Sequence, residues 1–169
     1  MGLNAAQLYV QSILQGLQPP GDTGVPGPIE ALITPYDPDE SGAARIYVWP
    51  ATGPESRLAW PRNTGPNTPA GWKQIRHSIQ LYLVWFDDQD QDQNIDINFP
   101  ALIDYVMFTL RTTLDPADVS DPYTGTSSLL LDIGEDMNYD YVPPRSTADQ
   151  RILRYDAKIS VPVTEYFIA

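Results

Sequence analysis

Residues 75–86 read IRHSIQLYLVWF, and this stretch decides the fold of the chain. At a period of two residues, one face of an extended strand carries Ile75, His77, Ile79, Leu81, Leu83 and Trp85. The opposite face carries Arg76, Ser78, Gln80, Tyr82, Val84 and Phe86. The pattern predicts a strand that begins with one apolar face and ends with two. A sheet with two apolar faces must be covered by helices or by other subunits, so the stretch favours a component of an assembly.

The length of 169 residues and the hydrophobic content of 42% predict a single globular domain that spans residues 1–169. The chain has no cysteine, which excludes disulfides, thiolate metal sites and a cysteine nucleophile, and which suits a cytoplasmic protein. Residues 1–17 lack the basic region and the continuous apolar core of a signal peptide. No apolar run approaches the roughly 18 residues that a membrane span needs, so we expect a soluble protein without membrane contact.

The chain is strongly acidic, and its charges are unevenly distributed. The formal net charge is −12, and no Lys or Arg precedes Arg45. Four of the ten basic residues lie near the C-terminus, at Arg145, Arg151, Arg154 and Lys158. Such a chain is not expected to wrap nucleic acid, because phosphate contacts need clustered basic side chains. Acidic and basic segments are instead expected to meet across a subunit boundary, where charge complementarity sets the register. The alternative is an acidic surface that keeps the protein soluble.

Apolar spacing predicts two helices. The first covers 5–17 with Asn4 as its N-cap, and the second covers 99–114 with Asn98 as its N-cap and Pro100 in its first turn. Alternating apolar residues predict strands, which we expect at 45–49, 73–86, 127–133 and 151–167. Three further segments are short: 29–34 is a strand or a helical turn, 57–60 is a strand fragment, and 136–142 continues the preceding strand or forms its hairpin partner.

These elements predict an α+β fold in which two helices pack on one face of a sheet. The sheet is expected to be mainly antiparallel, with a mixed sheet as the alternative, and to contain four to six strands. Pro162 on the polar side of the last strand indicates an edge that is at least partly open. Residues 50–72 are rich in Pro and Gly, and they predict a long hairpin arm that orders against a neighbouring subunit.

The acidic loop at 87–94 reads DDQDQDQN, which raises the question of a calcium site. Asp88, Asp90 and Asp92 match the first ligand positions of an EF-hand loop. Gln93 and Phe99 stand where that loop needs a glycine and a glutamate, and a register that starts at Asp90 fails as well. A solvated turn is therefore favoured over a loose divalent-ion site, and no metal is expected.

No grouping of residues predicts catalysis or a cofactor. His77 is the only histidine, and its place on the apolar face favours a core or interface histidine with a partner over a catalytic base. The chain has no G-x-S-x-G elbow and no glycine-rich phosphate loop. Glycoside hydrolysis needs a pair of carboxylates, but a chain with 22 acidic residues contains such pairs in any case, so their presence does not indicate a glycosidase. Packing at the base of the arm is favoured over a sugar or peptide platform for the four tryptophans, Trp49, Trp60, Trp72 and Trp85.

The order of the expected elements resembles that of a known family. An N-terminal helix leads through a Pro-rich hairpin to a long strand that reads WKQIRHSIQLYLVW at 72–85. The amphipathic helix at 99–114 and two late strands follow. In this order the chain resembles the tail-terminator (tail-completion) proteins of long-tailed bacteriophages and, more broadly, the small α+β proteins that form rings at the phage head–tail junction. The likeness covers most of the chain and includes no short signature motif.

The resemblance implies a structural virion protein without catalytic residues, made in the cytoplasm of the host bacterium and located in the tail or neck. It implies a homo-oligomer, a hexameric ring, that caps the tube of the major tail protein, stops its polymerisation and docks to the head-closure or connector protein. DNA passes through the lumen without specific binding, which suits carboxylates that repel phosphates. We expect interface residues in the arm, the acidic loop and the last strand: Trp49, Arg57, Trp60, Arg62, Trp72, Asp87, Asp88, Asp90, Asp92, Arg154 and Lys158.

Two alternatives are kept. The first is a head-closure or connector adaptor of the same junction, which differs from a terminator in its place relative to the last ring of the tube. The second belongs to a different class and is a small acidic hydrolase or a carbohydrate-binding module. That alternative requires a deep pocket that contains His77 or a close pair of carboxylates.

Overall fold

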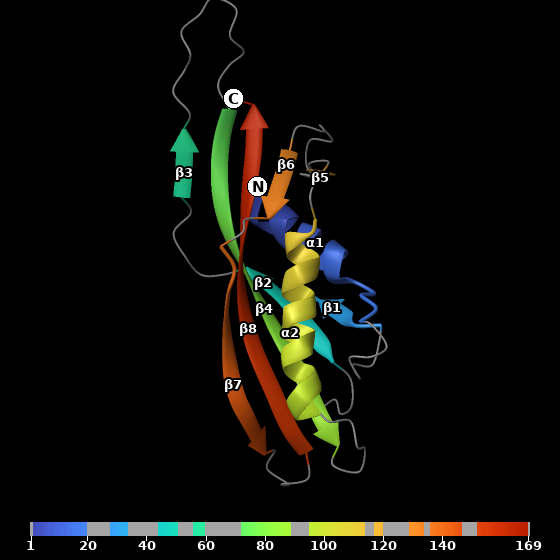
Figure 1. Cartoon of the computed structure of the whole chain (residues 1–169). Coiled ribbons are helices and arrows are strands. Elements are labelled where there is room, and N and C mark those ends of the chain that lie inside the picture. The colour runs from blue at the N-terminus through green and yellow to red at the C-terminus, as the bar shows by residue number, and fades with distance from the viewer. Residues whose placement is uncertain are drawn as a thin grey trace, which may run out of the picture.

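Two long strands form the axis of the molecule. The computed structural model describes residues 2–19, 28–33, 44–50, 56–59, 72–88, 95–113, 117–119, 129–133, 136–146 and 152–168. Strands β4 (Trp72–Asp88) and β8 (Ile152–Ile168) have 17 residues each and pair antiparallel over their whole length. At about 3.4 Å per residue each strand spans roughly 55 Å. Figure 1 shows β4 and β8 running side by side through the molecule.

The strands on the β4 side make the sheet mixed. β2 (Arg45–Pro50) pairs antiparallel with the second half of β4, and β3 (Ser56–Ala59) pairs antiparallel with the first half. β1 (Glu30–Leu32) pairs parallel with β2 and lies at the end of the strand order. An ion pair of 3.4 Å between Arg45 Nε and Glu30 Oε2 joins β1 and β2 at their first residues.

Three strands lie along the other edge of β8. β6 (Leu129–Ile133) and β7 (Asn138–Ser146) pair antiparallel with β8 one after the other, and β5 (Ala117–Val119) pairs with β6. Of the two alternatives for 136–142, the structure therefore has the continuation along one edge. Pro162 lies between the two pairing segments, where the ladder is interrupted and a residue without an N–H is tolerated.

Both helices contribute to one hydrophobic core. α1 (Gly2–Leu14) and α2 (Ile95–Arg111) bury apolar residues in the same cluster as alternate residues of β4 and β8. The largest side chains of this core are less than 2% exposed, and they are Trp85, Tyr155, Phe99, Leu14, Ile29, Ile46, Ile79, Leu81, Leu83, Leu102 and Leu110. We use "core face" for the side of the sheet that these strand residues occupy.

The alternation predicted for residues 75–86 is present in the structure. On the core face, Ile79, Leu81, Leu83 and Trp85 are fully buried. On the opposite face, exposure falls along the strand: Arg76 and Ser78 are exposed, Gln80 and Tyr82 are half-buried, and Val84 and Phe86 are buried. The strand therefore begins with one apolar face and ends with two, as predicted.

Glutamine side chains of α1, together with that of Gln15, the residue directly after it, cover the outer edge of β1. Gln11 Nε2 donates to the carbonyl oxygen of Ala31 at 3.0 Å, and the Ala31 N–H donates to Gln15 Oε1 at 3.2 Å. One turn earlier in α1, Gln7 Nε2 donates to the carbonyl oxygen of Val48 in β2 at 2.7 Å. Residues four apart lie on one side of a helix, so the three glutamines face the sheet together. The two bonds to Ala31 occupy the backbone groups that an additional strand would use.

Both helices begin before the predicted residues. α1 begins at Gly2 and α2 at Ile95, so Asn4 and Asn98 lie inside the helices and do not cap them. Pro100 likewise lies inside α2, beyond its first turn. In α2 the apolar repeat of the sequence continues before Asn98, because Ile95 precedes Phe99 by four residues. α1 ends at Leu14, ahead of the predicted 17, and Gly16 with a positive φ of 73° follows.

The prediction of an α+β fold is confirmed, and the sheet is of the mixed type. The sheet has eight strands. Five of them, β2, β4, β6, β7 and β8, have at least five residues, which agrees with the predicted four to six. The other three have three or four residues each. β1 and β3 fall on the segments 29–34 and 57–60, which were predicted as a strand or helical turn and as a strand fragment, whereas β5 was not predicted.

Two predicted segments lie largely outside the described residues. Of the arm at 50–72, the structure describes Pro50, β3 and Trp72, whereas 51–55 and 60–71 lie outside. Of the acidic loop at 87–94, Asp87 and Asp88 belong to β4, and this corrects the predicted start of the loop. β8 extends far enough to pair with both residues. Residues 89–94 lie outside the described part.

Candidate assembly surface

The sheet face opposite the core face carries a second, smaller hydrophobic cluster. This far-face cluster consists of the buried residues Tyr47, Val84 and Phe86 and the half-buried residues Leu32, Trp49 and Tyr82. The register of three strands brings these side chains together, because Tyr47 lies opposite Tyr82 in β4 and opposite Leu32 in β1. Residues that lie directly opposite each other in a sheet point to the same face.

A pocket of about 200 Å³ opens in the far-face cluster. The rings of Trp49 and Tyr82 lie 5.1 Å apart at an angle of 60°. Lys158 Nζ lies 5.8 Å from the centre of the Tyr82 ring, within the range of a cation–π interaction. The residues that line the pocket are Tyr47, Trp49, Tyr82, Val84 and Arg154.

The pocket combines aromatic surface with positive charge. Arg154 Nε donates to Asp156 Oδ1 at 2.7 Å within β8, which fixes the guanidinium beside the rings. Trp49, Arg154 and Lys158 are all half-buried, so the pocket is open to a ligand. Trp, Tyr and Arg in partly buried pockets are the residues that contribute most to protein–protein affinity. The chemistry therefore suits an apolar side chain of another protein with a carboxylate next to it.

Three of the predicted interface residues lie around this pocket. Trp49 comes from β2, and Arg154 and Lys158 come from β8, on the two sides of β4. For four others the structure describes the backbone in β3 and β4; these are Arg57, Trp72, Asp87 and Asp88. The remaining four, Trp60, Arg62, Asp90 and Asp92, lie outside the described residues. A role of any of them at an interface stays a prediction.

Three residues that line the pocket were not predicted at an interface: Tyr47, Tyr82 and Val84. Tyr47 and Tyr82 belong to two predicted strands, and no pattern in the chain places them together. The register between β2 and β4 brings these two residues together, because it places Tyr47 opposite Tyr82. Strand register depends on contacts between distant segments, so one sequence does not reveal it.

His77 and Glu165 form a buried pair on the core face. His77 Nε2 lies 2.7 Å from Glu165 Oε2, and the two side chains are 6% and 5% exposed. The β4–β8 register places them as diagonal neighbours, because His77 lies opposite Val163 and Glu165 opposite Ile75. The prediction of a core histidine with a partner is confirmed. Glu165 was missed, although the alternation of the last strand places it on the same face as Val163.

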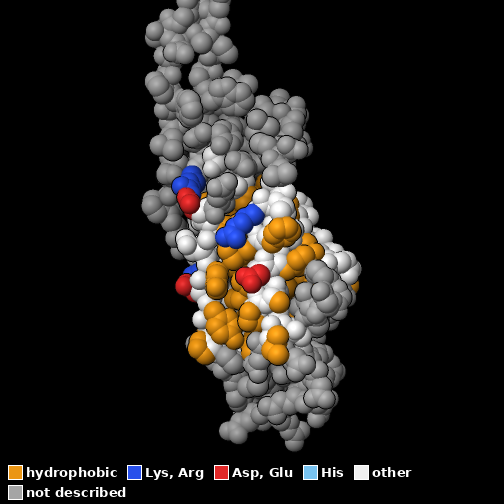
Figure 2. All heavy atoms as spheres, in the orientation of Figure 1, with side chains coloured by type: hydrophobic (Ala, Val, Ile, Leu, Met, Phe, Trp, Pro, Cys, Tyr) orange, Lys and Arg blue, Asp and Glu red, His pale blue; other side chains and the backbone are white. Residues whose placement is uncertain are grey.

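The helix side of the molecule exposes large apolar residues. In α2, Ile97 is 73% and Phe108 62% exposed; in β7, Tyr139 is 53% and Tyr141 41% exposed. Figure 2 shows hydrophobic side chains gathered over α2 and β7 on this face, interrupted by acidic and basic groups. A groove of about 240 Å³ separates the two elements and is lined by Pro100, Ile103, Asp104, Tyr139 and Tyr141.

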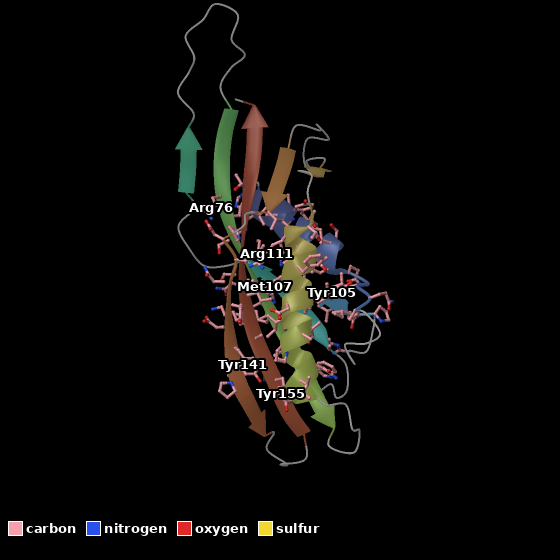
Figure 3. All side chains as sticks on the ribbon, viewed as in Figure 1. Arg76, Tyr105, Met107, Arg111, Tyr141 and Tyr155 are labelled. Carbon is pink, nitrogen blue, oxygen red and sulfur yellow. The ribbon has the colours of Figure 1, made fainter. Side chains whose placement is uncertain are left out.

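Aromatic contacts attach β7 to α2 below this groove. The Phe99 ring in α2 lies 5.9 Å from the Tyr141 ring and 5.7 Å from the Tyr155 ring. Figure 3 shows Tyr141 and Tyr155 reaching α2 from β7 and β8. On the side of α2 toward α1, Tyr105 Oη donates to the carbonyl oxygen of Gln18 at 2.9 Å. Contacts on both flanks thus fix the orientation of α2 and of its outer face.

Metal sites and membrane spans are the remaining features of interest. Within the described ranges, no three His, Asp or Glu residues lie close enough together to hold a metal ion. Of the two helices in the described part of the chain, neither is long and apolar enough to cross a membrane.

No protein-family model matches the chain, and a search of curated proteins finds no match. The function is therefore inferred from the residues of the chain itself.

Proposed function

We propose that this chain is a structural, non-enzymatic protein of a long-tailed bacteriophage virion, a ring-forming tail terminator. The ring, which we propose to be a hexamer, caps the tail tube, stops polymerisation of the major tail protein and docks to the head-closure or connector protein. The observation that carries the proposal is the far-face pocket, where half-buried aromatic and cationic side chains gather on a sheet face away from the two helices.

A second protein surface is a suitable occupant for this pocket. Covering Trp49 and Tyr82 removes aromatic surface from water, which favours association. The chain has 22 acidic and 10 basic residues, so a neighbouring copy offers carboxylates to Lys158, whereas Arg154 is already paired with Asp156. In a closed ring each copy presents such a surface once, and a different surface of the next copy covers it.

Two further features support a place at the end of a tail tube. The order α1, three strands, the long β4, α2 and the late strands agrees with the element order on which the resemblance rests. The net charge of −12 suits a ring around DNA, because carboxylates near the lumen repel phosphates and leave the DNA free to move.

His77 supports a non-enzymatic role. A general base must reach the proton that it removes from a substrate. The only histidine of the chain is instead paired with Glu165 at 2.7 Å and is 6% exposed at its side chain. His77 lines neither the far-face pocket nor the groove between α2 and β7.

Tube capping is the direct test. The purified protein is added to a polymerising major tail protein, and tube lengths are measured by electron microscopy, with the mass of the free protein measured by light scattering. We expect growth to stop and a ring to appear at one end of each tube. A protein that remains monomeric and leaves tube growth unchanged contradicts the proposal. A position on the connector side, without contact to the tube, identifies a head-closure adaptor instead.

A matched pair of variants connects the test to the pocket. Trp49→Ser/Lys158→Glu removes one ring and reverses one charge at the pocket, whereas Tyr139→Ser/Arg76→Glu makes the same kind of change at exposed positions outside it. We expect the first variant to lose ring formation and tube capping and the second to keep both. Equal loss in the two variants contradicts a role of the pocket. Urea unfolding of both variants verifies that they are folded.

A further inference from the structure

We propose that the outer face of α2 forms an antiparallel, two-fold contact with α2 of a second copy of this chain. The outer face is defined by Ile97, Ala101, Asp104, Phe108 and Arg111, which recur every three or four residues and so form one stripe. Its apolar members include Phe108, which is 62% exposed and lies between the two charged residues, and Ile97, which is 73% exposed and lies about two turns before Asp104, beyond the overlap of the two helices. The inference goes beyond the ring and does not depend on it.

The two charges on this stripe identify the partner. Asp104 and Arg111 are both exposed, and neither has an ion-pair partner within the described residues. They are seven residues apart, which corresponds to about 10.5 Å along the helix axis. A two-fold axis midway between them passes beside Phe108. Around this axis Asp104 of each copy faces Arg111 of the other, and the two Phe108 rings meet at the centre.

The parallel, in-register arrangement of two helices lacks this complementarity. If the helices ran parallel and in register, Asp104 would face Asp104 and Arg111 would face Arg111, and like charges repel. In the antiparallel arrangement both ion pairs form at once, and helices pack at 8–10 Å between axes, a distance that two phenylalanine side chains fill. A two-fold contact is also self-complementary, so that one surface suffices for both partners.

A charge exchange between two variants tests the contact. Sedimentation velocity measures dimerisation in the Trp49→Ser/Lys158→Glu background. This background removes the proposed ring contact, so that the α2 contact is the only proposed contact that remains. Asp104→Arg and Arg111→Asp each place like charges opposite one another, so we expect each variant alone to dimerise about tenfold more weakly. In a mixture of the two variants, every Arg faces an Asp again. We expect the mixture to dimerise within about twofold of the parent.

The controls separate this contact from effects of net charge. Asp136→Arg and Arg76→Asp change the charge by the same amounts at an exposed ion pair outside the stripe. We expect neither of them, nor their mixture, to alter dimerisation by more than about twofold. Phe108→Ser is expected to weaken the dimer at least about tenfold with an unchanged urea midpoint.

Three outcomes overturn the proposal: a parent protein that is monomeric up to about 1 mM, single variants that dimerise like their controls, or a mixture that fails to recover. The last outcome indicates a partner other than a second copy. Because the ring contact is absent from this background, tube capping can fail or succeed without affecting the result.

Discussion

Glu165 Oε2 lies 2.7 Å from Nε2 of His77 across the central strand pair, and both side chains are almost fully buried. Buried polar groups lose their hydrogen bonds to water on folding, so each of these groups depends on the other. The pair lies at the end of the core face where β6 also pairs with β8. It therefore specifies the register of β4 and β8 in a region where a slip of one residue would separate the two groups.

Removing both partners is expected to destabilise the protein by less than the sum of the two single removals. His77→Leu and Glu165→Leu each leave a buried polar group without its partner, and we expect each to lower the free energy of unfolding by about 1–3 kcal/mol. The double variant is expected to be less destabilised than the sum of the two, because it leaves no orphaned group. Urea unfolding followed by tryptophan fluorescence measures all four proteins. Strictly additive effects would show that the two side chains do not interact.

The two faces of the described elements are expected to differ in their sensitivity to truncation. Leu81 is fully buried in the core, so Leu81→Ala is expected to lower the free energy of unfolding by about 2–5 kcal/mol through lost burial and a residual cavity. Ile97→Ala at 73% exposure serves as the control, with an expected change within about 0.5 kcal/mol. Thermal unfolding at a concentration where the protein is monomeric provides the comparison. A similar cost at both positions would mean that Ile97 is covered in solution.

The glutamines of α1 are expected to protect the outer edge of β1. Gln11→Leu/Gln15→Leu removes both side-chain bonds to Ala31, and each bond contributes about 0.5–1.5 kcal/mol. We expect the Ala31 amide to exchange its hydrogen faster, and the variant to self-associate more readily through the open edge. Gln7→Leu is the matched control, because Gln7 bonds Val48 instead. NMR hydrogen exchange that is equally fast in both variants would contradict edge protection by Gln11 and Gln15.

The sequence predicted the elements whose patterns are long enough to be read. The alternation of β4 over residues 75–86 and the apolar stripe of α2 each repeat several times, and both elements are present. The short strands β1, β3 and β5 contain too few residues to repeat a pattern, and their pairing is decided by neighbours distant in sequence. The helix starts were missed because Asn4 and Asn98 are good caps in isolation, whereas α1 begins at Gly2 and α2 at Ile95.

The candidate surface was predicted only in part for a similar reason. Trp49, Arg154 and Lys158 were recognisable as bulky or charged residues in strands, and they lie around one pocket. Tyr82, which contacts two of them, was predicted only to lie on the second face of its strand, and only the register of β2, β4 and β8 shows what surrounds it. Glu165 as the partner of His77 likewise depends on the pairing of two strands that are far apart in the sequence.

The charge at the far-face pocket is expected to matter for assembly and little for folding. Lys158 is half-buried and interacts with the Tyr82 ring at 5.8 Å, so Lys158→Gln is expected to lower monomer stability by no more than about 1 kcal/mol. In an assembly the same ammonium group also meets a carboxylate of the neighbouring chain, and the loss is larger when both are desolvated. We therefore expect Lys158→Gln to raise the protein concentration needed for ring formation several-fold, and higher salt to raise it for the parent as well.

Arg76→Gln, at an exposed ion pair away from the pocket, provides the control and is expected to assemble like the parent. Light scattering over a range of concentration and salt measures both effects, and an assembly indifferent to Lys158 and to salt would place the contact elsewhere on the molecule.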